Sequence, residues 1–297
     1  MHVLACVPAY NEQDHIGELI KEILDYVDSV AVCDDGSSDF TSKEAKNAGA
    51  YVIKHKKNLG KGAALRSLFN YAKQSSADVI VTIDGDKQFL PKEIPKLTKS
   101  IIEKTSDVVI GNRFDEKDQV PSYRKFGNKI LDHATNIVTD IPIKDTQSGF
   151  RAYSKRAIEV MEFSNNGFSA DSEILISIVQ NKLRITEENV TVIYNTGHRT
   201  STKNPVLHAG GVFASLIEMI LIKHPLRYLG IPGIILIITG IVSSVYVLTV
   251  FNDIGYFSVP YTLLAIATLA FGLLMILVSG LLFTFNIQLK KKDQNKN

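Results

Sequence analysis

The amino-acid sequence predicts an α/β domain with a mostly parallel sheet, followed by two transmembrane helices. As far as Gly111, short runs of strand-forming residues alternate with amphipathic stretches, which is the pattern of strand–helix–strand units. One run, Val79–Ile83, is uncharged and almost wholly apolar, as expected for a strand covered on both faces. Towards the carboxyl terminus, two long apolar runs carry almost no charge, which does not suit a water-soluble surface.

The strands and helices of the front part follow from side-chain periodicities of about 2 and 3.6 residues. The predicted strands are Val3–Val7, Val30–Cys33, Tyr51–Lys54, Val79–Ile83, Val108–Ile110, Gly149–Tyr153 and Val190–Tyr194. The predicted helices are Asp14–Val27, Thr41–Ala48, Gly62–Ala72, Pro91–Glu103, Lys125–Val138 and Asp171–Gln180.

Residues 228–251 and 261–285 form the two long apolar runs. The first run, of about 24 residues, would extend roughly 36 Å as a helix, against a hydrocarbon core of about 30 Å. A buried helical hairpin in a soluble protein is the alternative, but such long charge-free stretches are rare outside membranes. Basic residues flank the two spans on one side only, so the positive-inside rule predicts that the front domain and both termini are cytoplasmic.

The chain is therefore expected to divide into a soluble domain, a membrane-surface segment and an integral membrane part. These are a domain of residues 1–204, amphipathic interfacial helices at 205–227, transmembrane helices at 228–251 and 261–285, and a cytoplasmic tail at 286–297.

Overall charge argues against a nucleic-acid partner. The chain has 33 Lys and Arg against 31 Asp and Glu, and residues 1–227 carry equal numbers of each, whereas nucleic-acid-binding domains usually have a basic excess. The two cysteines, Cys6 and Cys33, each lie in an apolar run, so we expect buried, reduced thiols in a cytosolic domain.

A metal-binding motif follows the central apolar strand. Asp84 and Asp86 are one residue apart at the point where Val79–Ile83 ends, and open α/β sheets bind ligands at the carboxyl ends of their strands. Two carboxylates in this position can share a hard cation such as Mg²⁺ or Mn²⁺, with Gln88 as a neutral oxygen ligand. The alternative is an acidic turn with solvated carboxylates.

Two further turns, Val7–Glu12 and Asp34–Asp39, place polar groups at the same predicted edge, where a nucleotide could lie. Another strand-to-helix turn is Asn58–Gly62. The last turn is not a P-loop, because the required GxxxxGK[ST] spacing is absent.

Taken in order, these turns and the Asp pair resemble family 2 glycosyltransferases with the GT-A fold. Gly111–Phe114 and the run Asp145–Tyr153 resemble the branch of that family that makes dolichyl- and polyprenyl-phosphate sugars, and Ser201–Pro205 resembles its archaeal members. One departure is Gly85, which stands where the family usually has Ala.

The resemblance implies roles for individual residues. The nucleotide would be bound by Pro8, Ala9, Tyr10, Glu12, Asp35, Asp84, Arg199 and Lys203. The metal ligands would be Asp84, Asp86 and Gln88. The acceptor phosphate would be held by Arg113 and Arg124, which together with Asp84 and Asp86 would form the catalytic set.

The resemblance implies transfer of a hexose (glucose, N-acetylglucosamine or mannose) from a UDP- or GDP-linked sugar to dolichyl or polyprenyl phosphate. The transfer would invert the configuration of the sugar and would take place at the cytoplasmic membrane face. The product would be used in protein glycosylation. A lipid monophosphate is largely dianionic at pH 7, because its second pKa is near ~6. It is already a nucleophile, so it needs the charge neutralisation that arginine provides rather than a general base.

Other functions remain open from the sequence. A hydroxyl acceptor on a glycan, glycolipid or protein would need a carboxylate base, for which Asp171 or Glu173 is available. A non-enzymatic membrane scaffold with a decayed nucleotide site is disfavoured by the intact Asp pair, and a processive polysaccharide synthase by the absence of Trp. The arginines could instead be structural, with Arg151 bracing a turn through Asp145. The sequence leaves homo-oligomerisation open.

Overall fold

The computed structural model describes residues 1–113, 135–136, 142–161, 170–193, 220–221 and 224–294. It divides into two compact units, residues 1–213 and 214–297. The predicted boundary between 204 and 205 and the observed one both fall within a stretch outside the described residues.

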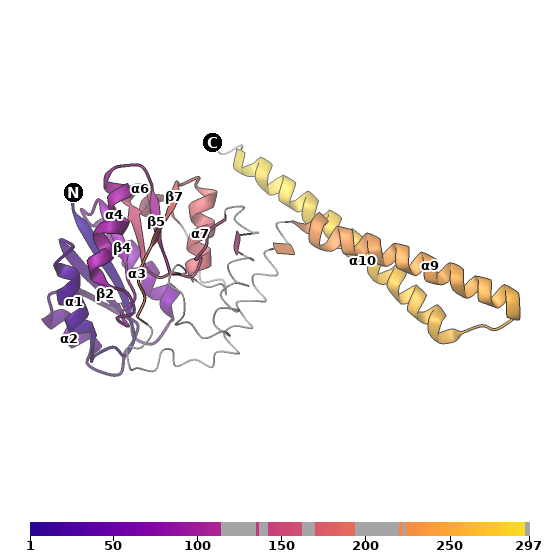
Figure 1. Ribbon diagram of the computed structural model, residues 1–297, viewed down its shortest axis with the longest axis horizontal. Coiled ribbons are helices and arrows are strands. Elements are labelled where there is room, and N and C mark those ends of the chain that lie inside the picture. The colour runs from indigo at the N-terminus through magenta and orange to yellow at the C-terminus, as the bar shows by residue number, and fades with distance from the viewer. Residues whose placement is uncertain (114–134, 137–141, 162–169, 194–219, 222–223, 295–297) are drawn as a thin grey trace. The chain divides into compact units, whose positions relative to one another are not determined.

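The first unit is built on a twisted sheet of seven described strands (Figure 1). The strands are β1 (Val3–Ala9), β2 (Ser29–Asp34), β3 (Tyr51–Lys54), β4 (Val79–Thr82), β5 (Val108–Asn112), β6 (Arg151–Ser154) and β7 (Ile185–Asn189). Their order is β3-β2-β1-β4-β6-β5-β7, and only β6 runs against its neighbours among these strands. The carboxyl ends of β1, β2, β4 and β5 therefore share one edge of the sheet.

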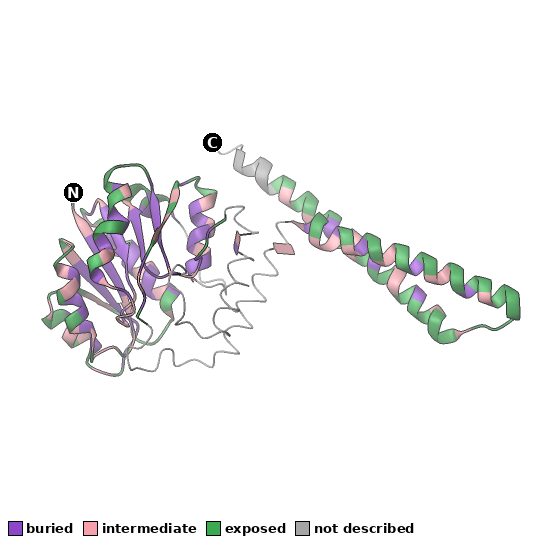
Figure 2. Ribbon diagram, viewed as in Figure 1, coloured by how far each residue is buried: buried purple, intermediate pink, exposed green. Residues whose placement is uncertain are grey.

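Helices cover both faces of this sheet. They are α1 (Ile16–Leu24), α2 (Thr41–Asn47), α3 (Lys61–Gln74), the short 3-10 helix η1 (Pro91–Glu93), α4 (Ile94–Ile102), α6 (Lys155–Val160) and α7 (Ala170–Gln180). Alternate residues of each strand pack into two apolar cores, one with α1, α2 and α4 and the other with α3, α6 and α7. Figure 2 shows the buried residues concentrated between these layers. The predicted α/β fold with a mostly parallel, mixed sheet is confirmed.

Both cysteines lie in these cores, as the sequence predicts. Cys6 and Cys33 are buried free thiols. Burial, followed by the charges of Asp35 and Asp34, raises the pKa of the Cys33 thiol to about 12, so it is unreactive at neutral pH.

The last strand of the sheet lies earlier than the sequence predicts. The prediction of a strand at Val190–Tyr194 is wrong, because the strand is Ile185–Asn189 and Val192 makes only an isolated bridge to Phe89. Within the described residues β7 pairs with β5 alone, so it tolerates the charged sequence Ile-Thr-Glu-Glu-Asn that hides its strand character. Of the predicted helix Lys125–Val138, only residues 135 and 136 are described, and both are helical.

The second unit contains two long helices. A π-helical turn, η2 (Leu226–Gly230), leads into α9 (Ile231–Ile254), and α10 (Val259–Gln294) follows. The candidate spans Leu226–Ile254 and Val259–Gln288 each have a mean hydropathy of 2.5 over their most apolar window, only 11% of which is buried. A core helix of a soluble protein would be mostly buried, so these are the properties of membrane spans (Figure 2).

The carboxyl-terminal end of this unit differs from the sequence prediction. Helix α10 continues to Gln294, so the segment predicted as a tail from residue 286 is helical for most of its length. Most of the predicted interfacial segment 205–227 lies outside the described residues.

The two long helices pack closely at Gly233 and Gly272, where a Cβ on either residue would lie within 2.9 Å of the other's carbonyl oxygen.

Candidate active site

Asp84 and Asp86 lie at the carboxyl end of β4, and the run Asp145–Tyr153 comes up against them. A Cβ on Gly149 would overlap the carboxylate of Asp84, so a glycine is required for this close approach. The hydroxyl of Thr82 donates a hydrogen bond of 3.0 Å to the carbonyl of Gly149, which fixes the two segments together. The most specific sequence motif therefore contacts the Asp pair directly.

Burial and neighbouring negative charges raise the pKa of two carboxyl groups at this edge, Asp86 and Glu12. Burial, and then the charge of Asp84, raises the pKa of Asp86 to about 6. Burial, followed by Asp86, raises the pKa of Glu12 to about 7, with smaller contributions from Asp39, Asp14 and Asp84. Carboxylates that resist ionising together are stabilised in their charged form by a cation.

The chemistry of this donor set fits Mg²⁺ or Mn²⁺. Within the described residues no group of three His, Cys, Asp or Glu forms a complete protein cage. Two carboxylates, with the neighbouring Gln88, suit an ion that takes its remaining ligands from substrate phosphates and water. The backbone N–H of Gln88 donates to Asp86 at 3.2 Å, so the turn already holds these two residues together.

A lysine joins Asp84 to helix α7. The ammonium of Lys61 lies 2.8 Å from Oδ1 of Asp84 and 3.5 Å from Oδ2 of Asp171. Burial lowers the pKa of Lys61, but the carboxylates of Asp171 and Asp84 outweigh this effect and hold the pKa above its ordinary value. Lys61 is therefore a cation at neutral pH, in contact with a predicted metal ligand.

Arg151 also contacts Asp171. Its buried guanidinium donates to the backbone carbonyls of Ser148 at 2.8 Å, Thr146 at 2.7 Å and Asp171 at 3.2 Å. Its Nη2 also lies 3.8 Å from the Asp171 carboxylate. Arg151 thus braces the turn through backbone carbonyls and not through Asp145, and Asp171 is enclosed by two cations.

Arg113 forms an ion pair with Asp145. Its Nε and Nη2 donate to the two carboxylate oxygens at 2.6 and 2.8 Å, and its backbone N–H adds a third bond of 3.1 Å. Asp145 is fully buried and the Arg113 side chain is 17% exposed. Of the predicted basic residues, the structure places only Arg113, at the end of β5, while Arg124, Arg199 and Lys203 lie outside the described residues.

The residues predicted to bind the nucleotide at the ends of β1 and β2 lie at one edge of the sheet. Ala9 lies opposite Asp34 in the parallel pair, with Pro8, Tyr10 and Glu12 on either side of it in the chain. The loop after β1 is fastened to the turn after β2, because the backbone N–H of Glu12 donates to the Thr41 hydroxyl at 2.8 Å.

Asp35 is part of the frame of this edge. Its buried carboxylate accepts hydrogen bonds from the backbone N–H of Leu59 at 3.0 Å and of Gly60 at 2.6 Å. Nδ1 of His55 lies 2.7 Å from the same carboxylate, and Nε2 of His55 lies 2.8 Å from the Ser67 hydroxyl. Asp35 therefore fixes the turn that starts α3 at Lys61.

Residues 5–161 match the family model described as glycosyl transferase family 2. The chain belongs to this family. A UDP-N-acetylglucosamine–dolichyl-phosphate N-acetylglucosaminyltransferase of Methanococcus voltae is 32% identical over 211 residues, covering 63% of this chain and 84% of the relative. A dolichol-phosphate mannosyltransferase of Pyrococcus furiosus is 35% identical over 191 residues, covering 59% of this chain and 53% of the relative.

The fold of this glycosyltransferase is also seen in crystal structures. Glucosyl-3-phosphoglycerate synthase of Mycobacterium tuberculosis, solved with Mn²⁺, UDP and phosphoglyceric acid, gives a TM-score of 0.57 at 20% identity. The match covers 74% of this chain and 77% of the synthase. The GT-A fold implied by the sequence resemblance is thereby confirmed.

Sequence reasoning missed two residues of the glycosyltransferase site, Lys61 and His55. Lys61 is the first residue of α3, whose first turn contains no acidic residue. A cation at this end of a helix opposes the helix dipole, which signals that its charge has a partner elsewhere. His55 carries no comparable signal, because its partners Asp35 and Ser67 are distant in sequence.

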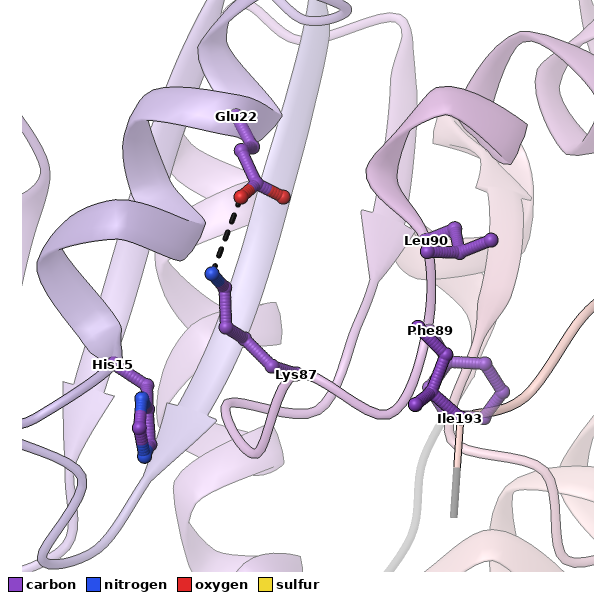
Figure 3. A pocket seen from close by; sticks show the side chains of 6 residues that line it. All are labelled: His15, Glu22, Lys87, Phe89, Leu90 and Ile193. Carbon is purple, nitrogen blue, oxygen red and sulfur yellow. Dashed lines mark ion pairs between the residues drawn. The ribbon is translucent and has the colours of Figure 1, made fainter. Parts of the chain in front are cut away.

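A cavity of about 300 Å³ lies beside the turn that follows Asp86 (Figure 3). It is lined by His15, Glu22, Lys87, Phe89, Leu90 and Ile193. Lys87 extends towards α1, where it pairs with Glu18 at 2.7 Å and Glu22 at 3.2 Å. Neither Asp84 nor Asp86 lines this cavity, so it is separate from the candidate metal site.

Proposed function

We propose that this glycosyltransferase moves a hexose from a nucleotide sugar to the phosphate of a dolichyl or other polyprenyl lipid. The observation that carries the proposal is the pairing of Asp171. This carboxylate is in contact with Lys61 and close to Arg151, so its oxygens already pair with cations of the protein. A phosphate acceptor needs no base, whereas a hydroxyl acceptor does. The names of the archaeal relatives support the same acceptor.

Arginines would neutralise the acceptor phosphate. Asp145 orients the Arg113 guanidinium through two hydrogen bonds, and a guanidinium binds phosphate oxygens through charge-assisted hydrogen bonds. Arg124 would supply a second cation. Arg199 and Lys203 would bind the diphosphate of the donor. These assignments rest on the family resemblance of the sequence.

Asp84, Asp86 and Gln88 would hold a divalent cation against the donor diphosphate. A cation there would stabilise the charge that develops on the leaving nucleoside diphosphate. The Mn²⁺ in the M. tuberculosis neighbour supports this use of the fold. The residues of this chain would align acceptor and donor for a single in-line displacement, which inverts the configuration at the anomeric carbon.

We further propose that the transferase domain and both termini are cytoplasmic. Lys223 and Arg227 precede the first span and Lys290–Lys292 follow the second, while the connection between them has no basic residue. Exposed aromatic side chains at the connection, Tyr256, Phe257 and Tyr261, suit the opposite membrane interface. This orientation gives the site access to cytoplasmic nucleotide sugars.

The experiment is a donor screen on membranes that contain the protein. Polyprenyl phosphate is supplied with each labelled sugar nucleotide in turn: UDP-glucose, UDP-N-acetylglucosamine and GDP-mannose. We expect one donor to label a lipid-phosphate sugar, with no labelling by the Asp86→Asn variant. Label found on a glycan or protein, with none on polyprenyl phosphate, would contradict the proposal and favour a hydroxyl acceptor.

A further inference from the structure

Lys61 lies in the candidate site, but neither the sequence motifs nor the proposed reaction gives it a role. Its ammonium makes two short contacts to Asp84, 2.8 Å to Oδ1 and 3.1 Å to Oδ2. Both oxygens that would bind a divalent cation are thus already in contact with a protein cation. The Lys61 side chain is 37% exposed, so it has room to move.

The backbone at Lys61 is held in place, whereas its side chain is partly exposed. Lys61 follows Gly60, whose backbone N–H is bound by the buried carboxylate of Asp35. Nδ1 of His55 lies 2.7 Å from Oδ1 of Asp35 and helps to hold that carboxylate in place. The ammonium can therefore shift by side-chain rotation alone, between partners near the start of α3.

Asp171 is the second partner available to the ammonium. Its Oδ2 lies 3.5 Å from Nζ of Lys61, while Arg151 donates a hydrogen bond to its backbone carbonyl and lies 3.8 Å from its Oδ1. A cation that leaves Asp84 can move towards Asp171 without becoming an unpaired charge.

From this geometry we propose that Lys61 is an internal counter-cation that competes with the divalent metal for Asp84. The metal then binds weakly by itself and tightly together with a nucleoside diphosphate, whose negative charge offsets the repulsion between metal and ammonium. Lys61 is a positioning residue in this scheme, and the inference rests on the metal site of the proposed function. By linkage, the nucleotide also binds more tightly when the metal is present.

The test measures binding of Mn²⁺ to the full-length protein in detergent, by electron paramagnetic resonance, with and without saturating UDP or GDP. Lys61→Met keeps the aliphatic stem and removes the charge. We expect about tenfold tighter Mn²⁺ binding in the absence of nucleotide, and a smaller gain on adding nucleotide than in the wild type. Lys61→Arg keeps the charge and should behave as the wild type.

Lys87→Met is the matched control. Lys87 also bridges two carboxylates and lies next to Asp86 in the chain, but it extends towards α1 (Figure 3). Its loss should change Mn²⁺ affinity less than twofold. An equal gain in both variants would mean that net charge alone is responsible and would overturn the inference.

Asp171→Asn supplies a test of opposite sign. Without Asp171, Lys61 should remain on Asp84 and Mn²⁺ affinity should fall, and this effect should nearly vanish in the Lys61→Met background. Unchanged or weaker Mn²⁺ binding by a folded Lys61→Met protein would overturn the inference. Absence of Mn²⁺ binding by every variant, with or without nucleotide, would overturn the metal site as well, whereas the identity of the acceptor is decided separately by the donor screen.

Discussion

At the scale of single residues, close packing and paired charges determine the site. The Asp84 carboxylate fits in its position because Gly149 has no side chain. The Asp145 carboxylate is paired with the guanidinium of Arg113. Each of these contacts joins residues more than thirty positions apart in the chain. Substitution of Gly149 should therefore change the geometry of the site, and substitution of Arg113 should change its ion pairing.

Gly149→Ala should disable the site by geometry. The added Cβ would overlap the Asp84 carboxylate, so that either Asp84 or the 145–150 turn must move. A displacement of about 1 Å can cost roughly 100-fold in rate, and we expect a loss of this order in transferase activity. Gly17→Ala is the control, since its Cβ would meet only ordinary contacts at 3.7 Å or more. Full activity of a folded Gly149→Ala protein would contradict the geometry.

Substitutions of Arg113 should separate its effect on protein stability from its effect on use of the lipid acceptor. Arg113→Ala leaves the buried Asp145 carboxylate without its partner, which typically costs about 3–5 kcal/mol of stability. Arg113→Lys keeps the charge but loses the bidentate pairing. We expect it to fold and to lose roughly 10- to 100-fold in kcat/KM for polyprenyl phosphate, with nucleotide binding nearly unchanged.

Arg184→Lys provides the comparison for this prediction. Arg184 makes a similar bidentate pair with the buried Asp107, at 3.0 and 3.3 Å, next to the start of β5 rather than its end. Its substitution should leave kcat/KM for the lipid unchanged. Weakened nucleotide binding by Arg113→Lys, with normal use of the lipid, would assign Arg113 to the other substrate.

At the scale of elements, the turns that follow β1, β2 and β4 create the site. Their order and their common edge could be predicted, because polar turns follow apolar strands and parallel strands end together. What could not be predicted was the contact between distant segments, such as Lys61 with Asp171 or His55 with Asp35. Local periodicity also misplaced β7, because an edge strand can carry the charged residues Glu187 and Glu188.

The cluster of carboxylates at this edge should make stability depend on pH. The pKa of Glu12 is raised to about 7 and that of Asp86 to about 6, so between about pH 4.5 and 7 the folded state binds more protons than the unfolded chain. Stability of the metal-free protein should therefore fall as pH rises through this window. Thermal unfolding in EDTA at several pH values measures this slope.

Glu12→Gln should reduce that slope, while the exposed Glu103→Gln should not. Added Mn²⁺ should stabilise the wild type more at pH 7.5 than at pH 5.5, since ionised carboxylates bind the cation. A slope identical in Glu12→Gln and the wild type would show that this cluster does not control the pH dependence.

At the scale of the whole molecule, a glycosyltransferase unit precedes two long apolar helices that have the properties of membrane spans. The spans could be predicted from hydropathy alone, because their length and lack of charge are local properties. The continuation of α10 to Gln294 could not, since its last residues have the polar composition of a solvated tail.

Orientation is tested by labelling single cysteines from outside intact cells. A Tyr256→Cys substitution lies in the connection between α9 and α10 and should be labelled, whereas Asn295→Cys should not. Both native cysteines are buried, so they should contribute little background. Labelling at position 295 and not at 256 would place the site away from cytoplasmic nucleotide sugars.

The acceptor is identified most directly by comparing two lipids as substrates of the purified protein. Polyprenyl phosphate and the corresponding polyprenol, which presents a hydroxyl group, are each supplied with Mn²⁺ and the sugar nucleotide found in the donor screen. We expect transfer to the phosphate alone, with inverted configuration at the anomeric carbon and no transfer by Asp86→Asn. Efficient transfer to the polyprenol, abolished by Asp171→Asn, would contradict the account, because it would make Asp171 a general base and the acceptor a hydroxyl.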